Sequence, residues 1–92
     1  MPMDELLRRS VSLHGIRVGQ VVDVILARGD ETVLGFEILC EDGRHRFLPA
    51  AASTVTDDAV VVDSPFALLD TDQLEFYRRR GTTLRTREDS AA

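Results

Sequence analysis

The chain has 92 residues, which is enough for one domain with one hydrophobic core and excludes a two-lobed catalytic architecture. Hydrophobic residues make up 43% of the chain and charged residues 29%, a balance typical of a globular protein rather than a disordered or membrane-spanning one. The single cysteine excludes an internal disulfide, and the net charge of −5 means that a nucleic acid could bind only at a local basic patch.

The N-terminal segment MPMDELLRR has no apolar stretch of signal-peptide length. The apolar runs that follow are far shorter than the roughly 20 residues that a membrane-spanning helix needs. We therefore expect a cytoplasmic protein that makes no contact with a membrane.

Short apolar runs alternate with turns rich in Gly and Asp from residue 9 onward. They predict strands over residues 9–13, 18–27, 33–40, 45–48 and 59–62. Because the connecting turns are short, neighbouring strands should be antiparallel. The pattern predicts a mainly β fold, a small antiparallel β-barrel of five to six strands followed by one C-terminal helix.

Alternation along two of these strands separates a core face from an outer face. In the strand over 33–40, Val33 and Leu39 fall on the face opposite the core. In the strand over 18–27 both faces carry apolar residues, and Val21 and Ile25 share a face with Asp23. These four apolar side chains predict an exposed surface through which two copies of the chain form a symmetric homodimer.

Asp23 interrupts an apolar strand, and we favour a solvent-facing position or an ion pair with a neighbour such as Arg17 over a role in an interface.

The segment CEDGRHRFLP places Cys40, Asp42 and His45 close together in sequence. Because they straddle a predicted turn, they cannot all converge on a metal ion. Cys40 lies on the apolar face and is expected to be a small buried hydrophobe rather than a nucleophile. We therefore expect no catalytic, cofactor-binding or metal-binding residues, and no enzymatic activity.

The segment LLDTDQLEFYRRRG predicts one helix near residues 71–80, capped by Asp70 or Thr71 and closed by Gly81. Leu74 and Tyr77 make its packing face against the barrel. Arg78, Arg79 and Arg80 should splay around the helix, since successive residues are about 100° apart. Residues 85–92 are polar and predict a flexible tail.

Several segments together resemble the PRC-barrel family over roughly residues 4–70. They are the VGxVxDV segment that begins at Val18, the LGFEI strand, the RFLP strand end and the closing DDAVVV strand. This family includes the cytoplasmic barrel of the photosynthetic reaction centre H subunit and the C-terminal domain of a bacterial ribosome-maturation factor. The resemblance implies a barrel domain over 4–70, with the helix over 71–81 packed on it, that serves as a docking or assembly module.

The strand pattern, the arginines and the resemblance together suggest two candidate functions. The first is a non-catalytic protein-interaction or assembly module, with Val21, Ile25, Val33, Leu39, Arg44 and Arg46 as the candidate interface. The second is an RNA- or ribosome-associated module that uses Arg44, Arg46 and the Arg78–Arg80 cluster. Salt dependence separates the two, because phosphate contacts weaken steeply with salt and an apolar interface does not.

Overall fold

The computed structural model describes residues 3–29 and 32–84, and this part of the chain forms seven strands and one α-helix. The strands are β1 (Ser10–Leu13), β2 (Ile16–Ala27), β3 (Val33–Cys40), β4 (His45–Pro49), β5 (Ser53–Val55), β6 (Ala59–Val62) and β7 (Gly81–Thr83). The helices are the α-helix α1 (Thr71–Arg80) and the short 3-10 helices η1 (Met3–Leu6), η2 (Ala50–Ala52) and η3 (Pro65–Ala67). The predicted tail over 85–92 lies outside the described residues.

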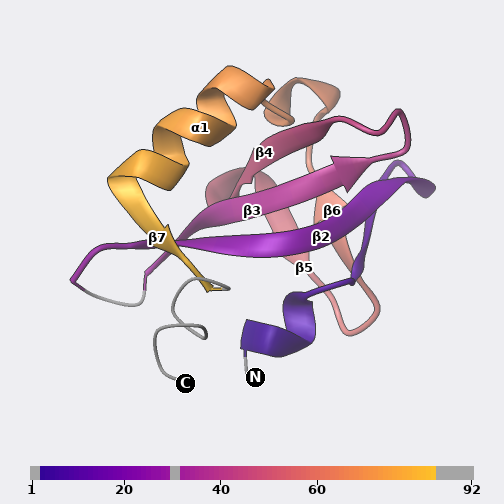
Figure 1. The fold of residues 1–92 in the computed structure, drawn as a ribbon. Helices are drawn as coiled ribbons and strands as arrows, with labels where there is room; N and C mark the ends of the chain where they lie inside the picture. The colour runs from indigo at the N-terminus through magenta and orange to yellow at the C-terminus, as the bar shows by residue number, and fades with distance from the viewer. Residues whose placement is uncertain (1–2, 30–31, 85–92) are drawn as a thin grey trace.

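The strands form one sheet in the order β4-β3-β2-β1-β6-β5, which curls so that β5 and β6 lie behind β2 and β3 (Figure 1). The long strand β2 pairs with β3 along one edge and, along the other edge, with β1 in its first half and β7 in its second. All pairs are antiparallel except β1–β6, which is parallel. The predicted mainly β fold with one C-terminal helix is confirmed, as a curled half-barrel with α1 lying over β4.

A bulge in β2 changes which side chains face the core. Val21 pairs with Ile38 and Asp23 with Glu37, so that Val22 is an extra residue without a counterpart in β3. A second irregularity follows between Ile25 and Leu26. Each bulge reverses the alternation that a regular strand would have.

The bulges, together with the covering helix α1, overturn part of the predicted outer surface. Val21 and Ile25 are both 0% exposed, so the prediction that they lie on a free apolar face is wrong. Val21 belongs to the core inside the barrel, and Ile25 is covered by α1 on the other side of the sheet. Val33, predicted to face away from the core, is partly buried and packs against it. Leu39 is partly exposed.

Two hydrophobic clusters lie on the two faces of the sheet. The barrel core on the inner face consists of the buried residues Leu6, Val11, Val21, Val24, Leu26, Phe36, Ile38, Cys40, Leu48, Val60 and Val62. The helix-side cluster on the outer face has three buried residues, Ile25, Phe47 and Leu74, with Leu34, Leu69 and Tyr77 packed around them. The Phe47 and Tyr77 rings stack with their centroids 4.2 Å apart. This confirms the predicted packing face of the helix.

Gly35 in β3 allows the close approach of β4 that this stacking requires. A Cβ atom at this position would collide with the Leu48 carbonyl oxygen and with the Phe47 ring. The glycine therefore lets the aromatic ring lie against the backbone of the neighbouring strand, between the sheet and α1.

Backbone and side-chain hydrogen bonds hold both ends of α1 on the sheet. At the start, Thr71 Oγ1 donates to the His45 carbonyl oxygen at 2.8 Å, and Leu69 just before the helix exchanges two backbone hydrogen bonds with Phe47 of β4. At the end, Arg28 donates from Nε to the Gly81 carbonyl and from Nη2 to that of Arg79, each at 3.1 Å. Among the described residues, no helix is long and apolar enough to cross a membrane.

Candidate functional site

Three segments meet at one end of the half-barrel and line a groove of about 380 Å³. They are the start of β2, the β3–β4 turn with the strand ends beside it, and the segment around η3 (Figure 1). We call it the hairpin-end groove, and its lining residues are Arg17, Val18, Cys40, Glu41, Asp42, Arg46, Pro65 and Leu68. Its apolar floor is continuous with the barrel core, to which Cys40 belongs and against which Val18 and Leu68 pack.

The β3–β4 turn that shapes one wall is built by local hydrogen bonds. Gly43 adopts a φ of 82°, which favours glycine, and its N–H donates to the Cys40 carbonyl. The Asp42 side chain accepts from Arg44 N at 2.9 Å, an arrangement typical of Asp in turns. Glu41 N donates to the Val18 carbonyl of β2, which ties the turn to the neighbouring strand.

Asp42 and Arg46 form a two-pronged ion pair across this turn. Arg46 Nη1 donates to Asp42 Oδ1 at 3.1 Å and Nη2 to Oδ2 at 2.8 Å. The hydrogen bonds from Arg46, followed by that from Arg44 N, lower the pKa of Asp42 to about 2, and the same pair raises the pKa of Arg46 above its usual value. The pair therefore holds the Arg46 guanidinium in a fixed position on the wall of the groove.

Two large apolar side chains project into solvent beside the groove. Phe66, next to the lining residue Pro65, is 89% exposed, and Ile16, next to Arg17, is 68% exposed. The backbone under Phe66 is ordered, because Ser64 Oγ accepts from Phe66 N at 3.2 Å and caps η3. Fully burying a side chain of this size is worth roughly 1.5–3 kcal/mol. Exposed apolar side chains next in the chain to residues that line an apolar groove are typical of a binding surface.

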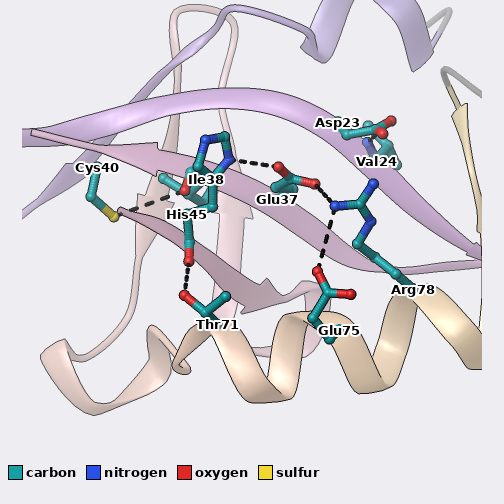
Figure 2. Close-up of polar contacts among 9 residues, drawn as sticks. All are labelled: Asp23, Val24, Glu37, Ile38, Cys40, His45, Thr71, Glu75 and Arg78. Atoms are coloured by element: carbon teal, nitrogen blue, oxygen red, sulfur yellow. Dashed lines mark hydrogen bonds and ion pairs between the residues drawn. The ribbon is translucent and has the colours of Figure 1, made fainter. Parts of the chain in front are cut away.

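A separate polar cluster lies between the sheet and α1, with Glu37 at its centre (Figure 2). Its carboxylate is 2.6 Å from His45 Nδ1 and 3.4 Å from Arg78 Nη1, and the glutamate side chain is only 9% exposed. Arg78 also lies 3.8 Å from Glu75 on its own helix. The cluster joins β3, β4 and α1, and we interpret it as structural.

Asp23 faces the same layer, since it lies opposite Glu37 in the β2–β3 register. It is buried, and its Oδ1 accepts from Val24 N at 2.9 Å. The prediction that Asp23 faces solvent is therefore wrong. The suggested partner Arg17 lies instead 3.6 Å from Glu41 and near the Gly19 carbonyl.

The structure brings some of the predicted interface residues together and separates others. Arg46 lines the hairpin-end groove, and Arg44 is exposed on the adjacent turn. Leu39 lines a neighbouring depression of about 240 Å³, to which Arg17 and Cys40 also contribute. Sequence reasoning did not identify Ile16 or Phe66 as exposed residues, because an apolar residue at the end of a strand or in a three-residue 3-10 helix has no periodic signal of its exposure.

The three chemically reactive groups of the CEDGRH segment do not converge on one point. Cys40 is buried with its sulfur 4.0 Å from the Ile38 carbonyl, and Arg46, which binds Asp42, interacts with Cys40 as well. His45 binds Glu37 on the opposite face of the sheet, away from the other two groups. Across residues 3–29 and 32–84, no three His, Cys, Asp or Glu side chains are grouped as a metal site requires.

Neither a protein-family model nor a curated protein matches this chain.

Proposed function

We propose that this domain is a non-catalytic protein-interaction module that binds a partner protein at the hairpin-end groove. The observation that carries the proposal is an apolar groove whose lining segments also carry the exposed side chains of Ile16 and Phe66. Interfaces depend on a few large side chains that become buried at their centre. The partner's chemistry follows from the lining: an aliphatic or aromatic side chain enters the groove, and polar groups meet Arg17 and Glu41 at the rim.

The arginines favour a protein partner over RNA. Arg46 is bound by Asp42, and Arg78 lies near Glu37 and Glu75. The carboxylates partly neutralise these two guanidinium groups within the chain, which reduces their value for phosphate contacts.

The resemblance to the PRC-barrel family supports the same proposal, because it implies a small barrel used for docking. Membership of that family remains part of the proposal, as does a cytoplasmic location. The curled, largely antiparallel sheet is compatible with such a barrel.

A photo-crosslinking experiment in the native cell tests the proposal. A photoreactive phenylalanine analogue at position 66 should form a crosslink to one protein in preference to others. In the same cells, Ile16→Asp in the labelled chain should abolish that crosslink, because it places a charge beside the groove. The matched control is Val55→Asp, which changes an exposed apolar residue of β5 that does not line the groove and should leave the crosslink intact.

A crosslink that is lost equally in both variants would contradict binding at the groove. Crosslinking to RNA, with binding that disappears on nuclease treatment and falls steeply with salt, would replace this proposal by the RNA-associated alternative.

A further inference from the structure

The solvent-facing side of α1 forms a second surface, distinct from the hairpin-end groove. Leu74 is buried and faces the sheet, whereas five other residues of the helix line a depression of about 530 Å³ on its outer side. We call it the α1 patch, and its residues are Asp72, Glu75, Phe76, Arg79 and Arg80. All five are exposed, and Phe76 is 45% exposed in spite of its size.

The charges of the α1 patch are ordered along the helix. Asp72 and Glu75 lie toward its start, and Arg79 and Arg80 form its end, with Phe76 between the two pairs. Residues four apart share a helix face, so that Asp72, Phe76 and Arg80 follow one another at intervals of about 6 Å. The Arg80 guanidinium lies 4.7 Å from the centre of the Phe76 ring.

We propose that the α1 patch binds the α1 patch of a second copy of this chain, with the two helices antiparallel across a two-fold axis at Phe76. In this arrangement Asp72 of each copy faces Arg80 of the other, and the two Phe76 rings meet at the centre. Glu75 and Arg79 of opposite copies are offset by about 3 Å along the axis, within reach of an arginine side chain. A surface that pairs with itself in this way is what a symmetric dimer requires.

The charge balance of the patch favours a second copy as the occupant. The whole chain carries a net charge of −5, so two copies repel each other at long range. The patch itself contains two acids and two arginines and is locally neutral, and the antiparallel arrangement converts all four charges into attractive pairs. The antiparallel helix dipoles make a small favourable contribution to the free energy of association. This dimer uses neither Val21 nor Ile25, which are buried within one chain.

Sedimentation equilibrium up to about 1 mM protein tests whether the dimer forms, because a small interface of this kind is expected to be weak. We expect the mass to rise from 10.2 kDa toward twice that value as concentration increases. Phe76→Ala should weaken association at least about tenfold, because the two-fold axis removes both rings at once. The matched control Val55→Ala truncates a similarly exposed apolar side chain outside the patch and should leave the association constant unchanged.

A charge exchange gives the decisive result. Asp72→Arg and Arg80→Asp should each weaken self-association about tenfold or more, because each places like charges opposite each other. An equimolar mixture of the two variants should associate again, since every facing pair is then one arginine and one aspartate. Circular dichroism of each variant checks that α1 is retained.

A protein that remains at 10.2 kDa up to 1 mM would overturn the proposal. A dimer that is insensitive to Phe76→Ala, or two charge variants that fail to associate when mixed, would equally exclude this surface. None of these outcomes bears on binding at the hairpin-end groove.

Discussion

The barrel core and the helix-side cluster lie on opposite faces of one sheet, but they differ in size and chemistry. The barrel core draws eleven buried side chains from η1 through β6, all of them hydrophobic. The helix-side cluster has three, and its border is the polar cluster of Glu37, His45 and Arg78. We infer that the barrel can hold its shape with α1 detached, whereas α1 and β7 depend on a few contacts and are the first part to open.

Removing a large side chain from the barrel core should have the largest effect. Ile38→Ala leaves a cavity at a position that is 0% exposed, and we expect it to lower the free energy of unfolding by about 2–5 kcal/mol. Urea unfolding measured by circular dichroism gives the change. The control Ile16→Ala, at the exposed turn, should change stability by less than about 0.5 kcal/mol. Equal effects of the two substitutions would contradict the assignment of Ile38 to the core.

Truncating a buried side chain in the helix-side cluster should destabilise only the part of the molecule around α1. Leu74→Ala should lower stability by about 2 kcal/mol, at the low end for a buried leucine, because α1 can shift to close part of the gap. Amide hydrogen exchange should quicken in α1 and β7 while amides of β2 and β3 in the barrel keep their protection. A uniform loss of protection through the sheet would show that the two clusters unfold as one unit.

A smaller effect is expected from the polar border of the helix-side cluster. Glu37→Gln keeps the shape of the side chain but removes the charge that faces His45 and Arg78, and it should cost about 1–2 kcal/mol in urea unfolding. Because Arg78 is partly exposed, we do not expect the larger cost of a fully buried pair. Glu75→Gln, at an exposed position on the same helix, should be nearly neutral. If Glu75→Gln is the more destabilising change, Glu37 is not the centre of a structural polar cluster.

The smallest expected effect concerns the exposed Asp42–Arg46 pair, which belongs to neither hydrophobic cluster. The pKa of Asp42 is about 2 in the folded chain, below its ordinary value of 3.8, so any stability that the pair contributes is present above pH 3.8 and is lost as the pH falls toward 2. In Arg46→Gln the carboxyl should titrate closer to 3.8, though Arg44 N still donates to it. An NMR titration of the side-chain carboxyl measures both midpoints. If Arg46→Gln leaves the titration midpoint of Asp42 unchanged, Arg46 is not the main cause of its low pKa.

The sequence predicted the elements that carry their own periodic signal. All five predicted strands exist with ends within two residues, and the helix spans residues 71–80 as expected. It missed β5 and β7, which have three residues each and exist only because longer strands offer them an edge. The STV and GTT segments contain too few residues to show alternation.

The errors at Val21 and Val33 have one physical cause. A strand's alternation can be read only while its pairing is regular, and the bulges at Val22 and near Ile25 exchange the two faces part-way along β2 and β3. Ile25 is a different case: its face was identified correctly as opposite the barrel core, but α1 covers it completely. Arg46 of the hairpin-end groove was among the predicted interface residues, and Leu39, predicted from strand alternation, lines the depression beside it, whereas Ile16 and Phe66 needed the structure.

Along one edge, β2 pairs with both β1 and β7, and these two partners differ in how far along the chain they lie. The β2–β3 and β3–β4 hairpins join residues that are close in sequence and can form quickly, whereas β7 reaches β2 only after nearly the whole chain has been ordered. Until it does, the segment 25–27 presents unpaired backbone groups along its edge. An open strand edge of this kind is a template for pairing with another chain. The arrival of β7 therefore completes the sheet and also closes the route from a late folding intermediate to aggregation.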